Sequence, residues 1–121
     1  MSRRFPYEYA LIRVVPDVAR GEFLNAGVLL YSREAQFLAG TVDLDVTRLL
    51  ALAPGIDVDA VRHSLAAICD CTPAEGESMG QRFRWLTMPR STVVQTSPIH
   101  TGASSDVAAE LVRITQRLVR R

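Results

Sequence analysis

Lysine is absent from this sequence of 121 residues, in which all fourteen basic residues are arginine. An arginine guanidinium stays protonated in proteins, so the chain holds neither a Schiff-base lysine nor a lysine general base. Thirteen acidic residues leave a formal net charge of +1. Because that charge is too small for the electrostatic footprint of a duplex-DNA binder, we expect no duplex-DNA partner.

Cysteine is scarce as well. Cys69 and Cys71 are the only two, spaced C-x-C. Two thiolates are too few for a structural zinc site, which would need histidine or carboxylate ligands from elsewhere in the chain. We therefore interpret both cysteines as reduced, with Cys69 packed in the core, and we predict neither a metal nor a cofactor.

Long apolar runs are also missing. None approaches the length that crosses a bilayer, and no signal-type apolar segment follows Arg3 and Arg4. These absences predict a cytoplasmic protein without a membrane partner. The length fits a single domain over residues 1–121, and we find no internal repeat and no interdomain linker.

The residues that are present predict an α+β fold. Segments rich in β-branched and aromatic residues predict strands over 7–15, 27–31 and 36–44, and a short fourth strand over 91–96. The second and third segments, separated by a short polar break, are typical of an antiparallel hairpin.

Helices are predicted from capping residues followed by apolar periodicity. Asp45 is expected to cap a short helix, and Asp57 or Asp59 a second one that ends near residue 72. Residues 74–80 are small and polar, which is typical of a mobile loop. A last helix follows Asp106. The order βββααβα predicts a mostly antiparallel sheet of about four strands, with helices packed on one face.

One stretch, residues 82–102 (RFRWLTMPRSTVVQTSPIHTG), concentrates unusual chemistry. It contains the single tryptophan, three arginines and one of the two histidines, and no acidic residue occurs between Glu77 and Asp106. Arg84 and Arg90 could hold a phosphate or carboxylate, and Trp85 could stack on a base or cover a peptide. The alternative is that Trp85 and Phe83 fill the core between sheet and helices while the arginines pair with surface acids.

The segments YEYALIRVVPD, RGEFLNAGVLLYSR and FRWLTMPRSTVVQTSPIHTG resemble the domain of unknown function 3037 family, small bacterial proteins. The resemblance implies an accessory or partner role, because members of that family are often encoded beside HipA-like kinases. The chain itself lacks the Gly-rich loop and the metal-binding motifs of a kinase. The positions that match the family pattern are Glu22, Asn25, Gly27, Arg84, Trp85, Arg90, Ser91, Ser97, Pro98 and His100.

Our first hypothesis is a non-enzymatic accessory module that recognises an anionic group on a partner protein, such as a HipA-like kinase, or on a nucleotide or phosphate. The site would lie in a groove between residues 20–27 and 84–100. It requires Arg84, Arg90, Asn25 and His100 to converge in one solvent-facing pocket. The residues that we predict to bind the ligand are Asn25, Arg84, Trp85, Arg90, Ser91, Ser97 and His100.

Two rival hypotheses remain open. A small hydrolase or transferase would use His100 as acid and base, with Glu22 as second carboxylate or metal ligand, or would pair His100 with Ser97 as nucleophile. His100 could equally be a loop histidine bonded to backbone, and Glu22 could form an ion pair with Arg90. The other rival, a single-stranded nucleic-acid binder, is disfavoured by the low net charge. The terminal helix could also mediate a homodimer, although we expect it to pack on its own sheet.

Overall fold

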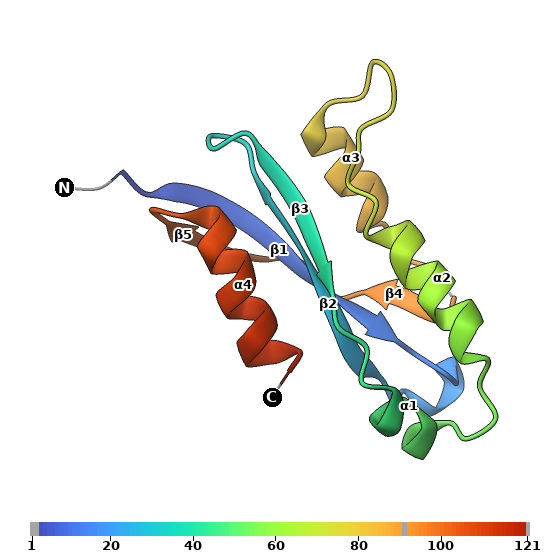
Figure 1. The fold of residues 1–121 in the computed structure, drawn as a ribbon. Helices are drawn as coiled ribbons and strands as arrows, with labels where there is room; N and C mark the ends of the chain where they lie inside the picture. The colour runs from blue at the N-terminus through green and yellow to red at the C-terminus, as the bar shows by residue number, and fades with distance from the viewer. Residues whose placement is uncertain (1–2, 91, 121) are drawn as a thin grey trace.

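The computed structural model describes residues 3–90 and 92–120 and is built around a five-stranded antiparallel sheet (Figure 1). β1 is the central strand. β2 pairs with one edge of β1, and β3 pairs with the outer edge of β2. The strands are β1 (Phe5–Val14), β2 (Leu24–Ser32), β3 (Phe37–Val42), β4 (Val94–Thr96) and β5 (His100–Ser104), and a 3-10 helix η1 (Val18–Arg20) connects β1 to β2.

The second edge of β1 is shared by β4 and β5. β4 pairs with the end of β1, from Ile12 to Val14, and β5 pairs with its beginning, from Phe5 to Tyr9. The two strands therefore form one edge that residues 97–99 interrupt. Proline at position 98 cannot donate to a ladder, which explains why regular pairing stops there.

Four helices begin at side-chain caps. Asp45, Asp57, Ser78 and Asp106 each accept a hydrogen bond from a backbone N–H in the first turn of the helix that follows. This contact satisfies one of the donors that a helix start leaves free. The helices are α1 (Val46–Leu52), α2 (Val58–Ile68), α3 (Met79–Leu86) and α4 (Val107–Leu118). None of these helices in the described chain combines the length and the apolarity that a membrane crossing requires.

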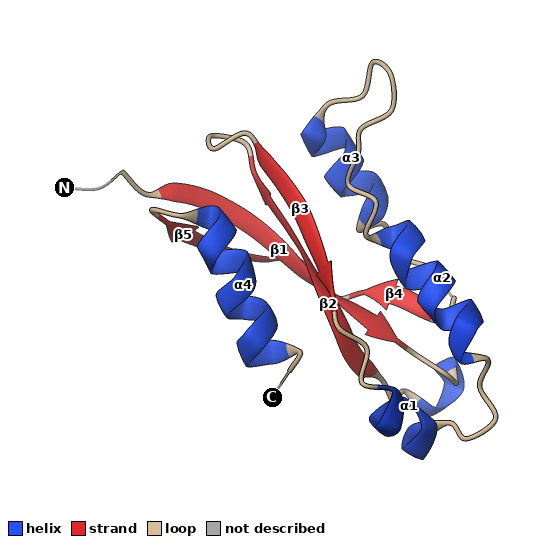
Figure 2. Cartoon of the chain, in the orientation of Figure 1, coloured by secondary structure: helices blue, strands red, loops and turns tan. Residues whose placement is uncertain are grey.

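The sheet carries a hydrophobic core on each face. Ile12 and Leu29 belong to a core closed by α1, α2 and α3, whereas their neighbours Leu11 and Leu30 belong to a second core closed by α4. Figures 1 and 2 show α4 on one side of the sheet and the other three helices on the opposite side. Successive strand residues point to opposite faces, so the continuous apolar runs of β1 and β2 require cover on both.

The predicted α+β class and the mostly antiparallel sheet are confirmed. Three details differ from the sequence-based expectation. The sheet has five strands, because residues 100–104 form β5, and helices cover both faces of the sheet instead of one. Helix α3 starts at Met79, inside the segment predicted to be a loop, where Ser78 and Gln81 form a reciprocal capping box.

Candidate functional site

The largest hollow among the pockets described is a cleft of about 690 Å³ between α2, the end of β1 with η1, and residues 85–90 and 92–94. We name it the α2–α3 cleft. Its lining is mostly aliphatic, with one indole and one guanidinium at the rim. The principal lining side chains are those of Val15, Val18, Ile68, Trp85, Arg90 and Val93.

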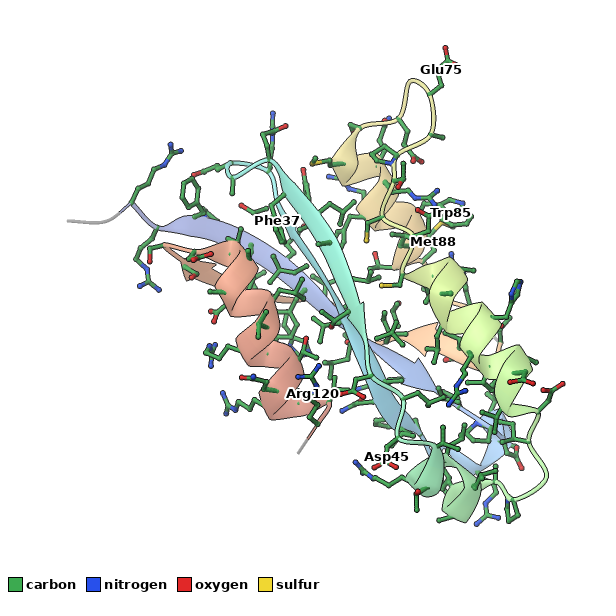
Figure 3. The ribbon with its side chains drawn as sticks, in the orientation of Figure 1. Phe37, Asp45, Glu75, Trp85, Met88 and Arg120 are labelled. Atoms are coloured by element: carbon green, nitrogen blue, oxygen red, sulfur yellow. The ribbon has the colours of Figure 1, made fainter. Side chains whose placement is uncertain are left out.

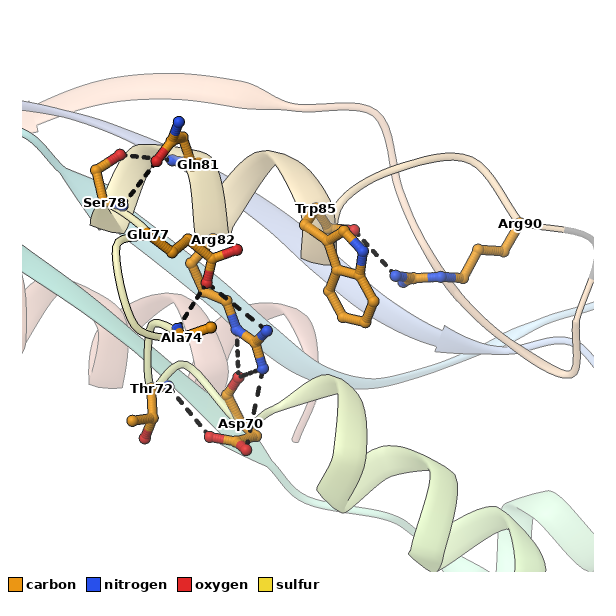
Figure 4. A network of polar contacts seen from close by, with 9 residues as sticks. All are labelled: Asp70, Thr72, Ala74, Glu77, Ser78, Gln81, Arg82, Trp85 and Arg90. Carbon is orange, nitrogen blue, oxygen red and sulfur yellow. Dashed lines mark hydrogen bonds and ion pairs between the residues drawn. The ribbon is translucent and has the colours of Figure 1, made fainter.

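Trp85 is the only aromatic side chain among the described lining residues of this cleft, and 51% of it is exposed to solvent. The guanidinium groups of Arg82 and Arg90 each lie 5.0 Å from the ring centroid, and Figure 4 shows the indole between them. Met88, 54% exposed, lies close by at the end of α3 (Figure 3). The alternative that Trp85 fills the core is therefore wrong, whereas Phe83 is a core residue.

Arg90 fixes the end of α3 as well as lining the cleft. Its Nη1 donates to the carbonyl of Leu86 and its Nη2 to that of Trp85, both at 2.9 Å (Figure 4 draws the second). Carbonyls in the last turn of a helix have no intrahelical partner, so the guanidinium acts as a C-terminal cap. The expected ion pair of Glu22 with Arg90 does not form, because Glu22 pairs with Arg20.

Arg82 supports the other side of the indole and is tied to the loop before α3. Its Nε and Nη2 donate to the carbonyl of Asp70, and its guanidinium lies 3.8 Å from the Glu77 carboxylate. The Asp70 side chain accepts from the backbone N–H of Thr72, and this hydrogen bond is the largest cause of its lowered pKa. Figure 4 shows this network, which holds Arg82 against Trp85.

Arg84 does not reach the α2–α3 cleft. One helical position before Trp85, it points to a different hollow, which Tyr31 and Arg33 of the β2–β3 hairpin also line. Neighbouring residues on a helix are rotated by about 100° about its axis, so adjacent side chains face different surroundings.

Asn25 and His100 lie away from both hollows. Asn25 pairs across the strands with Arg13, and its Nδ2 donates to the carbonyl of Leu118 at the end of α4. His100 pairs with Tyr9, and the two rings stack with centroids 5.2 Å apart. Since Tyr9 and Arg13 are four residues apart on β1, about 13 Å along the strand, Asn25 and His100 cannot share a pocket.

Ser97 is a buried structural residue. Its Oγ accepts a hydrogen bond from the Leu11 N–H and donates one to the Pro98 carbonyl, both at 2.8 Å. The hydroxyl therefore bridges the interruption between β4 and β5 and is not paired with His100, which rules out the expected nucleophile pair. Ser91, the remaining predicted site residue, lies outside the described residues.

Glu22 and His100 also lie too far apart to act together. His100 is opposite Tyr9 of β1, whereas Leu24, two residues after Glu22, is opposite Val14. Five residues of strand span about 17 Å. Within residues 3–90 and 92–120, no three histidine, cysteine or carboxylate side chains gather closely enough to hold a metal ion.

Sequence reasoning thus placed Trp85 and Arg90 in one cleft but missed the residues that complete it. Val15 and Val18 line the cleft. The sequence feature that could have indicated them is a valine on each side of Pro16-Asp17, just after the first strand. The expected convergence of Arg84, Arg90, Asn25 and His100 is wrong. Local sequence does not reveal which side of a helix, or which face of a sheet, a side chain occupies.

Comparison with known proteins gives a family and no functional precedent. The model of one protein family matches residues 9–119, which is nearly the whole chain. Neither the curated proteins nor the solved structures gave a match. The chain therefore belongs to the family described as protein of unknown function (DUF3037).

Proposed function

We propose that this protein is a non-enzymatic binding module that docks a segment of a partner protein in the α2–α3 cleft. The observation that carries the proposal is the cleft itself, about 690 Å³ with a mostly aliphatic lining. Its exposed apolar side chains include Val18 (55%), Trp85 (51%) and Val93 (41%). Contiguous exposed apolar surface of this kind is typical of interaction sites, and tryptophan and arginine are the residue types enriched at their energetic centres.

The chemistry of the rim indicates which segment would fit. Arg90 lines the cleft, and among the residues that the structure describes no acidic side chain does. Two of the five N–H donors of Arg90 are engaged by α3 carbonyls, and no carboxylate lies within ion-pair distance of this guanidinium in the described part of the chain. The occupant is therefore a segment with aliphatic side chains beside an aspartate, a glutamate or a C-terminal carboxylate.

A protein segment fits this cleft better than a nucleotide does. The guanidinium groups of Arg82 and Arg90 already lie against the indole, so a base would have to displace one of them in order to stack. The mostly aliphatic walls also offer few hydrogen bonds to a base edge, with Ser64 and Thr92 as the hydroxyl side chains among the described lining residues. The HipA-like kinase suggested by the family resemblance is the first partner to test.

The single tryptophan provides a direct assay. Because Trp85 is half exposed, a segment that enters the cleft should shift its fluorescence emission to shorter wavelength. We expect Val18→Asp to weaken binding of the purified partner by at least about tenfold, since it places a like charge beside the incoming carboxylate and removes apolar contact.

Val112→Asp is the matched control. Val112 is 51% exposed and lies on α4, on the opposite face of the sheet. A partner whose affinity falls equally for Val18→Asp and Val112→Asp, or for neither, would refute docking in the cleft.

A further inference from the structure

A second hollow, of about 300 Å³, lies between the β2–β3 hairpin and α3 and shares no lining residue with the α2–α3 cleft. We name it the hairpin pocket. Most of its lining residues carry polar side chains, in contrast to the mostly aliphatic cleft. Tyr31, Arg33 and Gln36 line it from the hairpin, and Ser78, Gly80 and Arg84 from α3.

The two arginines of this pocket are not neutralised by acids. Neither Arg33 nor Arg84 forms an ion pair in the described part of the chain, although five other arginines do. They come from separate elements, and each is held on a rigid one. Arg33 lies in a tight turn closed by two hydrogen bonds from Gln36 to the Arg33 carbonyl, and Arg84 lies within α3. Two exposed guanidinium groups beside one hollow raise the local positive potential and favour an anion there.

The hydroxyl of Tyr31 and the guanidinium of Arg84 both lie beside Gly80. A Cβ built on Gly80 would lie 2.9 Å from Tyr31 Oη and 3.3 Å from Arg84 Nη1, so the absence of a side chain is what leaves them room. Tyr31 Oη makes no hydrogen bond to any described residue. A phenol donor and a guanidinium donor thus lie close together at the pocket wall.

We propose that the hairpin pocket binds a phosphoryl group. Arg84 would hold two of its oxygens in bidentate fashion, the Tyr31 hydroxyl would donate to it, and Arg33 would supply the second positive charge. This site is separate from the cleft of the proposed function and does not depend on it. The same chemistry fits inorganic phosphate and the phosphate of a nucleoside monophosphate.

The acidic side chain of Glu8 opposes the proposed ligand. Glu8 is the cross-strand partner of Tyr31 and lines an adjoining hollow together with Tyr31 and Arg33, yet no ion pair joins it to Arg33 among the described residues. Its carboxylate should weaken anion binding. Glu8→Gln is therefore expected to strengthen phosphate binding by a few-fold, a gain that loss of folding cannot mimic.

The test is a titration of the full chain with inorganic phosphate and, separately, with a nucleoside monophosphate, followed by the Gly80 amide and the Arg84 Nε–H signals in ¹⁵N-resolved NMR spectra. We expect saturable shifts of both signals. Arg84→Gln and Arg33→Gln should each weaken binding by about tenfold or more. Arg48→Gln, an equal change of charge at an exposed residue of α1, should leave binding within about twofold.

Equal affinity for the two probes would identify free phosphate as sufficient, and tighter binding of the monophosphate would identify an ester as the ligand. The absence of saturable binding for both probes would overturn the proposal, as would an equal loss in Arg84→Gln and Arg48→Gln. Partner docking in the α2–α3 cleft should be unchanged in Arg84→Gln, so failure of either site is seen independently of the other.

Discussion

Replacement of Ser97 by alanine tests whether this residue belongs to the scaffold. In the folded protein the Ser97 hydroxyl accepts from the N–H of Leu11 and donates to the carbonyl of Pro98. Leu11 lies on the central strand and is buried, 7% exposed. Alanine removes both bonds and leaves a buried N–H without its partner.

The magnitude follows from these two bonds. An unsatisfied buried donor costs about 1–3 kcal/mol, and the lost bond to Pro98 adds about 0.5–1.5 kcal/mol, part of which relaxation recovers. We expect Ser97→Ala to lower the free energy of unfolding by about 2 kcal/mol. For a chain of this length, that corresponds to a decrease in Tm of about 8 °C.

Urea unfolding followed by circular dichroism measures this change directly. The midpoint should fall while the slope m stays constant, because the surface exposed on unfolding is unchanged. Ser105→Ala is the control, since Ser105 is exposed and should change stability by less than about 0.5 kcal/mol. If Ser97→Ala unfolds with the stability of the parent, the hydroxyl does not bridge the interrupted edge and our account of β4 and β5 is wrong.

Two further predictions concern the sheet. Burial and a hydrogen bond to Glu110 raise the pKa of Tyr7 from 10.0 to about 12. The stability that protonated Tyr7 contributes is therefore complete below pH 10 and is lost as the pH rises to 12. We expect the free energy of unfolding, measured by urea titration at each pH, to fall by about 2–3 kcal/mol in that window. Tyr7→Phe should remove most of this pH-dependent loss. Gly27→Ala would place a Cβ 2.1 Å from the Thr41 carbonyl oxygen. Because a backbone carbonyl cannot move aside as a side chain does, we expect Gly27→Ala to lower the free energy of unfolding in urea by about 3 kcal/mol or more. Gly55→Ala, which has open space around its Cβ position, should be about as stable as the parent. A Gly27→Ala variant as stable as the parent, or a parent whose stability does not change between pH 10 and 12, would contradict the packing described.

The candidate site was predictable only in part. The sequence pointed to residues 82–102, and Trp85 and Arg90 do line one cleft. Arg84, adjacent to Trp85, lines another hollow because helical geometry turns it away. Residues of one arginine-rich stretch without acidic residues can still point in different directions, because neither property specifies the orientation of a side chain. That these residues bind a ligand stays a prediction.

Several of the local elements were determined by the sequence alone, although α3 and β5 were not. Asp45 and Asp57 cap the helices that their side chains predicted. The apolar runs predicted over residues 7–15 and 27–31 fall in the two longest strands, β1 and β2, except for residue 15, which follows the end of β1. These signals are readable because caps and periodicity act over a few residues.

Only the tertiary structure decided how the elements combine. Helix α4 covers one face of the sheet, and α1, α2 and α3 cover the other. Periodicity could not reveal this assignment, because a strand buried on both faces shows the same continuous apolar run whichever helices cover each face. Likewise, His100 begins a strand because β1 offers an unpaired edge there, and Ser97 is buried because its hydroxyl completes that edge. Such pairings join residues some ninety positions apart, and no local pattern records them.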